Sequence, residues 1–328
     1  MNRTAYWPAA PLVFATLAAL GLAAIFASGC EGVTKRPGLL EMLVPPGPTE
    51  LSVLTCNVRY GTADDGPNAW GKRRELMVAG IKKLDPDFLC VQEALDFQVE
   101  YLMRELGMAS VGVGRDDGKL AGEFSAILYK SDKFAAESGS TFWFSNTPER
   151  PGSKTWGNTT PRICTFAGFV EPKSGRRFKV FNIHLDHQSE PSRNRSVELL
   201  SRAMLDSRQL GVPVIVTGDF NATPQSLAIR YVRGELESAV PAAERTAVMA
   251  ASPASPRLAD TLSASGSLPP TGADGTFHDF TGRTDGPRID YIFTDKGIET
   301  AGAGIDRFGD SGRFPSDHFA VWAKLRLK

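Results

Sequence analysis

A continuous run of apolar residues at positions 212–216 ends abruptly in a turn that carries two polar side chains. The segment reads VPVIVTGDFNATP, so Gly218, Asp219 and Asn221 follow the apolar run directly. An apolar run without alternation predicts a strand buried on both faces, and the glycine allows a sharp turn after it. Ligands bind beyond the carboxyl ends of strands in α/β sheets, so both polar groups are candidates for a site. Taken alone, the segment is better explained by ordinary turn formers.

Other apolar runs and helical periods predict strands and helices that alternate along the chain. One helix is predicted at 70–84, because Leu76, Val78, Ile81 and Leu84 recur at helical spacing. Residues 242–270, rich in alanine, serine and proline, are predicted to be the least ordered part of the domain. Strands and helices interleave with hairpin-like neighbours, so we expect mixed sheets. The remaining helices are expected at 97–106, 191–210 and 225–230, and the other strands at 51–58, 87–92, 109–113, 124–129, 141–144, 163–170, 178–184, 276–280, 289–294 and 318–326.

The first 29 residues have the pattern of an export signal. Arg3 precedes an apolar run at 12–27, and small residues then lead to Cys30 in the sequence ASGC. This order resembles the lipobox of bacterial lipoproteins, in which the cysteine is lipidated after cleavage. We therefore expect cleavage before Cys30, attachment to the membrane of the cell envelope through a lipid on Cys30, and a proline-rich tether at 30–49. An uncleaved membrane anchor and an ordinary secretory signal are the alternatives, although the apolar run is short for a membrane span.

The charge balance limits the classes of partner. The chain has 37 basic and 37 acidic residues, and loss of the signal removes only Arg3, which leaves a formal charge of −1. Proteins that bind long duplex DNA neutralise many phosphates with many bases, so this balance argues against a protein that coats nucleic acid. The three cysteines beyond the signal, Cys56, Cys90 and Cys164, lie in apolar runs without the spacing of a zinc site, and we expect buried free thiols.

Polar side chains suited to metal binding or proton transfer recur where apolar runs end. A single acid after a strand is usually a turn or cap residue, but that explanation accounts poorly for so many coincidences of this kind. The residues concerned are Asn57, Glu93, His184, Asp219, Asn221, Asp290, Asp317 and His318.

The segments around these residues carry a family resemblance. TCNVR, VQEA, NIHLDH, GDFNATP, RIDYIF and SDH are similar, in order and spacing, to motifs of the endonuclease/exonuclease/phosphatase superfamily. The similarity extends over residues 51–326. It implies one α/β domain at 50–328, built as a four-layer sandwich in which two packed mixed β-sheets are flanked by helices. It also implies a site at one end of the sandwich.

The residue types and the resemblance together assign roles. Carboxylate and amide oxygens suit Mg²⁺ or Mn²⁺, so Glu93, Asn57 and Asp317 are the predicted metal ligands. Asp219 is predicted to orient or deprotonate the attacking water and Asn221 to hold a phosphoryl oxygen, and a second metal near these two and His184 is an alternative. The resemblance places an acid on each histidine, Glu123 on His184 and Asp290 on His318, and we expect both histidines to be held charged. Taken singly, Glu123 is also typical of a surface acid and Asp290 of a partner for Arg288. Arg162 and Arg59 are candidate contacts to the substrate phosphate.

The function predicted from the sequence is that of a metal-dependent phosphoesterase. Hydrolysis of a phosphodiester or phosphomonoester by metal-assisted water attack fits the residue set. A small or lipid phosphoester is favoured as substrate over long duplex DNA, because few bases lie near the predicted site. A nuclease acting on DNA or RNA is the first alternative. A non-catalytic binding domain of the same fold in the cell envelope is the second, and the presence of Glu93, Asp219, Asp317 and His318 argues against it.

Overall fold

The strands of the described residues form two mixed sheets of six strands each; the sequence pattern predicted mixed sheets, and the family resemblance implied two of them. The computed structural model describes residues 47–240, 255–269 and 273–328. In the order of pairing, the first sheet contains β11 (Ile298–Asp306), β12 (Ala320–Leu327), β1 (Thr49–Asn57), β2 (Phe88–Gln92), β4 (Ile127–Tyr129) and β3 (Ala109–Val111). The second contains β5 (Ala135–Trp143), β6 (Ile163–Val170), β7 (Arg177–His184), β8 (Val214–Asp219), β10 (Asp290–Thr294) and β9 (Ala259–Asp260). Each sheet has one parallel pair, β1 with β2 and β7 with β8.

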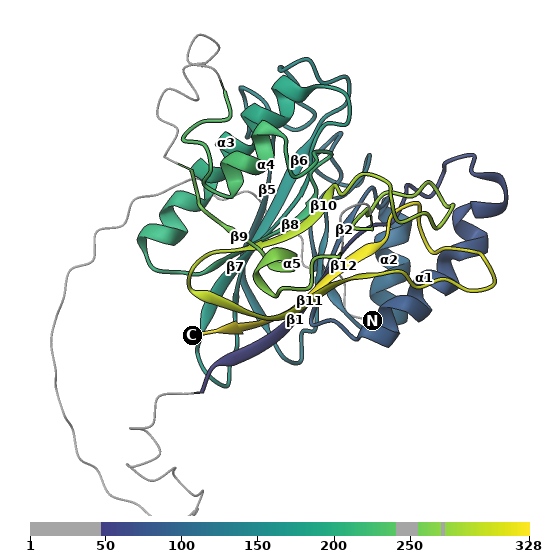
Figure 1. Ribbon diagram of the computed structural model, residues 1–328, viewed down its shortest axis with the longest axis horizontal. Coiled ribbons are helices and arrows are strands. Elements are labelled where there is room, and N and C mark those ends of the chain that lie inside the picture. Colours follow the sequence, from purple (N-terminus) through teal and green to yellow (C-terminus); the bar gives the residue numbers. More distant parts are fainter. Residues whose placement is uncertain (1–46, 241–254, 270–272) are drawn as a thin grey trace, which may run out of the picture. The chain divides into compact units, whose positions relative to one another are not determined.

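Helices cover the outer faces of the two sheets (Figure 1). A short 3₁₀ turn, Gly66–Asn68, leads into α1 (Trp70–Leu84), and α1 packs with α2 (Asp96–Leu106) on the first sheet. On the second sheet lie α3 (Glu190–Gln209) and α4 (Leu227–Val232), while α5 (Thr261–Ala264) is a single turn after β9. The apolar run of β1 shows why four layers form. Val53 faces the other sheet and Leu54 faces the helices, so successive side chains enter different cores.

A group of buried polar side chains joins the two sheets within the sandwich. The side-chain nitrogen of Gln92 on β2 donates to the side-chain oxygens of Asn182 on β7, at 2.6 Å, and of Thr55 on β1, at 3.0 Å. Asn182 in turn donates to the carbonyls of Val91 and Ala126, each at 2.9 Å. These contacts cross from one sheet to the other. They fix the register of β2 against β7, and the next polar residues along the chain are Glu93, directly after β2, and His184 at the end of β7.

Three expectations about the elements are corrected by the structure. Residues 276–280 form no strand and make only an isolated bridge between Phe277 and His318. The strand β11 was not predicted, because its sequence IETAGAGID has small residues in place of apolar alternation. The edge strand β5 begins at Ala135 and not at 141, and its exposed residues 137–140, ESGS, lack the apolar residues by which a strand is identified.

Several predictions concern residues outside the described part of the chain. These are the signal at 1–29, the lipidation of Cys30, most of the tether at 30–49, and parts of the segment 242–270. The part of that last segment that the structure describes contains β9 and α5, so it is more ordered than its composition indicated. Cys56, Cys90 and Cys164 are buried free thiols, as predicted.

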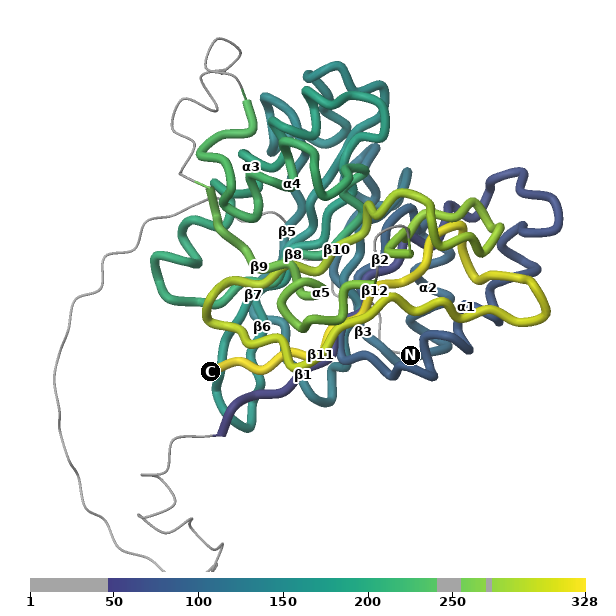
Figure 2. Tube along the Cα trace, viewed as in Figure 1, coloured from purple at the N-terminus to yellow at the C-terminus, as the bar shows by residue number. Residues whose placement is uncertain are grey.

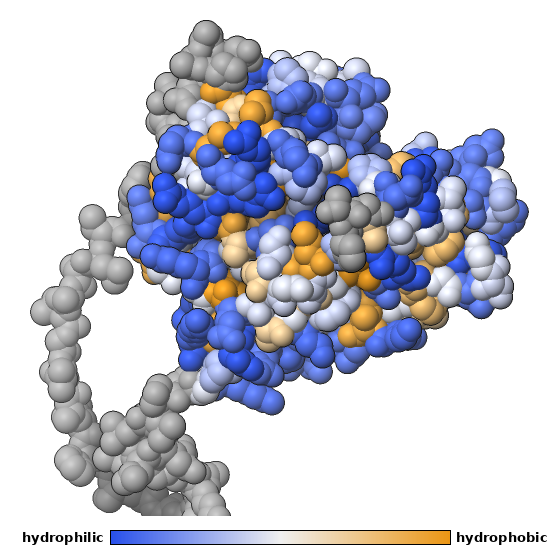
Figure 3. All heavy atoms as spheres, in the orientation of Figure 1, coloured by the Kyte–Doolittle hydropathy of each residue, from blue (hydrophilic) through white to orange (hydrophobic). Residues whose placement is uncertain are grey.

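The surface of the described residues is mainly polar. The face drawn in Figure 3 is largely hydrophilic, with apolar residues in small separate patches. Within the ranges that the structure describes, no helix has both the length and the apolar character needed to cross a membrane. The large hydrophobic residues with the most exposure there are Phe97, Leu120, Leu210, Leu227 and Leu268.

Candidate active site

Three adjacent strands of the second sheet place a histidine and two carboxylates side by side. His184 ends β7 and pairs with Asp219 at the end of β8, and Asp219 pairs in turn with Asp290 at the start of β10. The first sheet contributes Asn57 from the end of β1 and Glu93 from the residue after β2. The site therefore lies at one end of the sandwich and takes residues from both sheets. The sequence pattern and the family resemblance both predicted this place.

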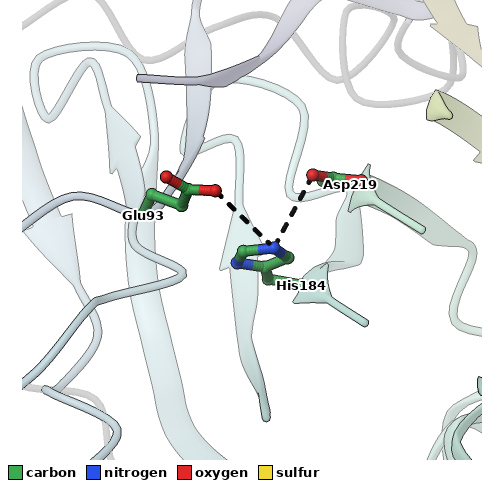
Figure 4. A group of neighbouring side chains, drawn as sticks. All are labelled: Glu93, His184 and Asp219. Atoms are coloured by element: carbon green, nitrogen blue, oxygen red, sulfur yellow. Dashed lines mark ion pairs between the residues drawn. The ribbon is translucent and has the colours of Figure 1, made fainter. Parts of the chain in front are cut away.

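Glu93, His184 and Asp219 form a first cluster across the two sheets. Nε2 of His184 lies 4.0 Å from a carboxylate oxygen of Glu93 and 3.6 Å from one of Asp219. Figure 4 shows the imidazole edge directed between the two carboxylates. The amide nitrogen of Asn57 donates to both acids, at 2.9 Å to Glu93 and 3.1 Å to Asp219. Its oxygen accepts from the backbone N–H of Arg59. In this arrangement Asn57, a predicted metal ligand, therefore presents nitrogen and not oxygen to the cluster.

Asp219 also belongs to a second cluster, with Asp290 and His318. Nδ1 of His318 is hydrogen-bonded to Asp290 at 2.9 Å, and Nε2 lies 4.0 Å from Asp219. Burial by itself would lower the pKa of His318, but the charge and hydrogen bond of Asp290 raise that pKa well above its ordinary value. The imidazole is therefore held charged. Burial, and then the neighbouring Asp290, raise the pKa of Asp219 to about 7.

The pairing of Asp290 with His318 depends on a second ion pair nearby. The sequence left open whether Asp290 pairs with Arg288. In the structure the guanidinium of Arg288 contacts both oxygens of Asp260 at 2.6 Å. Both partners of this pair are buried. Because Asp260 balances the charge of Arg288, Asp290 is available to bind His318.

Glu123 and His184 lie at ion-pairing distance, as predicted, but make no hydrogen bond with each other. Glu123 makes two hydrogen bonds with Arg115, at 2.5 and 2.7 Å, and its oxygen comes no closer than 3.8 Å to Nδ1 of His184. Burial, followed by the charges of Arg162 and Arg115, lowers the pKa of His184 well below its ordinary value. This direction favours a neutral imidazole over the charged one expected from the sequence, because burial and two guanidinium groups disfavour the proton.

Arg162 is buried against two histidines. One terminal nitrogen lies 3.2 and 3.0 Å from the ring nitrogens of His184, and the other lies 2.6 Å from Nδ1 of His187. Its Nε is 3.4 Å from Asp186, a residue that the sequence analysis missed. Asp186 and His187 follow His184 within three residues, in the segment HLDHQS. This closeness in the sequence could have identified both as residues near the site. Arg162 and Arg115 line a shallow surface depression together with Glu123 and His184.

The other predicted residues lie around the clusters. Asn221 has a left-handed backbone, φ 46°, and its N–H donates to Asp219 while its side-chain nitrogen donates to the carbonyl of Leu185. Arg59 pairs with Asp65, and its Nε is 3.9 Å from Asp317. Asp317 belongs to neither of the two clusters formed by the described residues. Burial raises its pKa.

Comparison with known proteins identifies the family. The model of the Endonuclease/Exonuclease/phosphatase family matches residues 54–318. An endonuclease/exonuclease/phosphatase structure from Bacteroides vulgatus is 30% identical, with a TM-score of 0.72, over 85% of this chain and 100% of that one. A mannosyl-6-phosphatase structure from Bacteroides thetaiotaomicron is 29% identical, with a TM-score of 0.69, over 84% of this chain and 99% of that one. An uncharacterised protein of Acanthamoeba polyphaga mimivirus is 30% identical over 54% of this chain and 69% of its own length.

The family match and the geometry of the site agree. The matched residues include every member of the two clusters, from Glu93 to His318. Members of this family hydrolyse phosphoester bonds, and they generally use a divalent metal. The chain belongs to the endonuclease/exonuclease/phosphatase family and is a hydrolase that acts on phosphoester bonds.

Proposed function

We propose that this protein is a divalent-metal-dependent hydrolase, using Mg²⁺ or Mn²⁺, that cleaves a small phosphoester by attack of water. The position of Asp219 carries this proposal. Its carboxylate is shared between the Glu93–His184 cluster and the Asp290–His318 cluster. The carboxylate of Asp219, which can accept a proton or bind a cation, therefore lies beside the charged imidazole of His318, which can donate a hydrogen bond.

The residues of the first cluster fit a hard cation. Glu93 and Asp219 offer carboxylate oxygens, His184 is held neutral with a nitrogen between them, and the ligand atoms lie within 4.8 Å of one another. Carboxylates gathered in a buried place repel each other, and a divalent ion would remove that cost. Glu93 would hold the ion, with His184 beside it, and the neighbouring Asp219 would serve as the base. A bound ion supplies Lewis-acid polarisation of the phosphoryl group.

The chain's own residues supply proton transfer and charge stabilisation. Asp219 accepts the proton of the attacking water, a role suited to a carboxylate whose pKa is raised to about 7. His318, kept charged by Asp290, donates from Nε2 to the phosphoryl oxygen that gains negative charge. Neutral His184 and cationic Arg162 contact each other at hydrogen-bonding distance, so Arg162 is placed to bind a substrate oxygen on that side of the site.

Two features favour a small substrate. Two guanidinium groups, those of Arg115 and Arg162, lie beside His184, and this number of cations suits a single phosphate group. The mannosyl-6-phosphatase is named for a small phosphomonoester, and its similarity to this chain extends over 84% of the chain. A sugar phosphate or a related small phosphomonoester is therefore the substrate class that we propose. Long duplex DNA would need many more cationic contacts.

A substrate screen tests this proposal. The purified protein would be assayed on p-nitrophenyl phosphate, bis-p-nitrophenyl phosphate, hexose phosphates, single-stranded and duplex DNA, RNA and phospholipid vesicles, each with Mg²⁺, with Mn²⁺ and with EDTA. We expect the fastest turnover on a small phosphoester and none in EDTA. Full activity in EDTA would contradict the metal assignment, and faster cleavage of plasmid DNA would favour a nuclease.

Export and lipid attachment at Cys30 are a further part of the proposal. The support comes from the sequence alone: Arg3, the apolar run at 12–27 and the small residues before the cysteine. We propose that the mature enzyme is attached to the cell envelope by a lipid on Cys30 and that residues 30–49 separate the lipid from the catalytic domain.

A further inference from the structure

Arg73 is a buried cation without a carboxylate partner among the described residues. It lies in the first turn of α1 and is 3% exposed, although its neighbours Lys72 and Arg74 are exposed. No carboxylate of the described residues lies within ion-pairing distance of it. Burial lowers its pKa to about 10, so the group stays charged at neutral pH. A buried charge of this kind is destabilising unless its hydrogen bonds are satisfied, so its position calls for an explanation.

Backbone carbonyls satisfy the guanidinium. Nε donates to the carbonyl of Asn68 at 2.8 Å, and one terminal nitrogen donates to Val58 at 2.7 Å and to Pro315 at 2.8 Å. The other terminal nitrogen donates to Arg59 at 2.9 Å. The group also packs against the rings of Trp70 and Phe280, at 5.1 and 5.6 Å from their centroids.

The carbonyls that Arg73 binds adjoin the active site. Val58 and Arg59 follow Asn57, whose amide bridges the acids of the two sheets. Pro315 precedes Asp317 by two residues. The side chain of Arg73 thus joins the turn after Asn57 to the segment that begins at Pro315. Pro315 lies 242 residues after Arg73 in the chain. It touches no reacting group itself and acts through the backbone.

One of these segments is strained. Arg59 has φ 55°, in the left-handed region that residues with a side chain rarely adopt. Its N–H donates to Asn57 and its carbonyl accepts from Arg73, so both of its backbone polar groups are held. The strained turn orients the Asn57 amide, and the guanidinium stabilises the turn.

We propose that Arg73 is a positioning residue, which fixes the Asn57–Arg59 turn against the Pro315–His318 segment and thereby holds the Asn57 amide on Glu93 and Asp219, the acids of the proposed cation cluster. The inference rests on the proposed function. A planar guanidinium reaches carbonyls in several directions at once, whereas a lysine ammonium is a point donor with three hydrogens. Arg73→Lys therefore keeps the charge and loses the geometry.

The test measures cation binding and not only turnover. Mn²⁺ would be titrated calorimetrically into the full chain, purified in mild detergent. The proteins compared are the wild type, Arg73→Lys and the control Arg74→Lys. Unfolding temperatures and the Mg²⁺ dependence of activity would be measured for the same three proteins. We expect Arg73→Lys to bind Mn²⁺ about tenfold more weakly or worse, as for other residues that orient metal ligands. The Mg²⁺ needed for half-maximal rate should rise, while the substrate KM at saturating Mg²⁺ should change little. Arg74→Lys should match the wild type in every measurement.

A second variant covers the case in which Arg73→Lys fails to fold. Ser316 donates to the carbonyl of Asn57 at 2.6 Å and independently ties the same two segments. Ser316→Ala should also weaken Mn²⁺ binding in a folded protein. Unchanged Mn²⁺ affinity in folded Arg73→Lys, or in Ser316→Ala if Arg73→Lys does not fold, would overturn the inference and leave the proposed function standing. Absence of Mn²⁺ binding by the wild type would overturn both.

Discussion

The buried amide of Asn182 offers a direct measure of how strongly the two sheets are held together. In Asn182→Leu the side chain keeps a similar size but loses its bonds to Val91, Ala126 and Gln92. Ala126 retains a backbone partner, the N–H of Val91, and Gln92 retains Thr55, so the carbonyl of Val91 is the group that loses most. One unsatisfied buried carbonyl and several lost hydrogen bonds cost about 3 kcal/mol of unfolding free energy.

Urea unfolding followed by tryptophan fluorescence would measure this loss, and the unfolding temperature should fall by about 5 °C. Asn146→Leu is the control, because Asn146 is exposed and its side chain accepts one bond, from Trp156. It should cost less than about 1 kcal/mol. If Asn182→Leu unfolded at the same urea concentration as the wild type, these polar groups would not join the sheets in the way the structure indicates.

Four further predictions concern the site, the pH dependence and the anchor. Glu93→Gln should abolish Mn²⁺ binding and turnover while circular dichroism stays unchanged; wild-type affinity would contradict its role as a ligand. Asp290→Asn should lower the pKa of His318, so that the loss of activity with rising pH begins at a lower pH. The loss of kcat should be smaller than the roughly 100-fold or more expected for His318→Ala. An unshifted pH profile would contradict the pairing. Burial lowers the pKa of His278 to about 4, so the unfolded chain takes up the proton first as pH falls. Stability should therefore decrease between pH 6.5 and 4, by at most about 1.4 kcal/mol per pH unit from this group, and His278→Leu should show a shallower slope in urea unfolding at several pH values. Cys30→Ser should release soluble protein or leave an unprocessed precursor, and mass spectrometry showing an unmodified Cys30 in the wild type would contradict lipidation.

The sequence predicts the parts of the fold in which burial is continuous. The run before Gly218 and the strand that ends at Asn57 are buried on both faces, so their patterns identify them without tertiary information. The candidate site residues at strand ends follow from the same patterns, because a polar residue that ends a buried run needs a polar partner, water or a ligand. Strand β11 gives no such pattern, since its alanines and glycines leave room for Trp322 on the neighbouring strand.

Side-chain partners are harder to predict than positions. Glu123 lies near His184, as the resemblance implied, yet its two oxygens bind Arg115. A bidentate arginine pair is stronger than a bond to a neutral imidazole, and only the hairpin geometry brings Arg115 within reach. Arg73 is a similar case. In the sequence it stands between two exposed bases, and nothing in that cluster shows that its side chain alone turns inward to the backbone of the site.

The first and last strands of the domain run side by side, with Thr49 opposite Leu327 (Figure 2). From Thr49 the strand β1 extends nine residues to Asn57, a length of about 27 Å at the usual rise per residue. Both termini of the domain thus leave it at the end of β1 remote from Asn57 and the candidate active site. A fluorescent reporter, a carrier protein or a sensor chip joined at either terminus would leave the substrate's approach open. Joining the two termini by a short linker would give a circularly permuted enzyme with its chemistry intact.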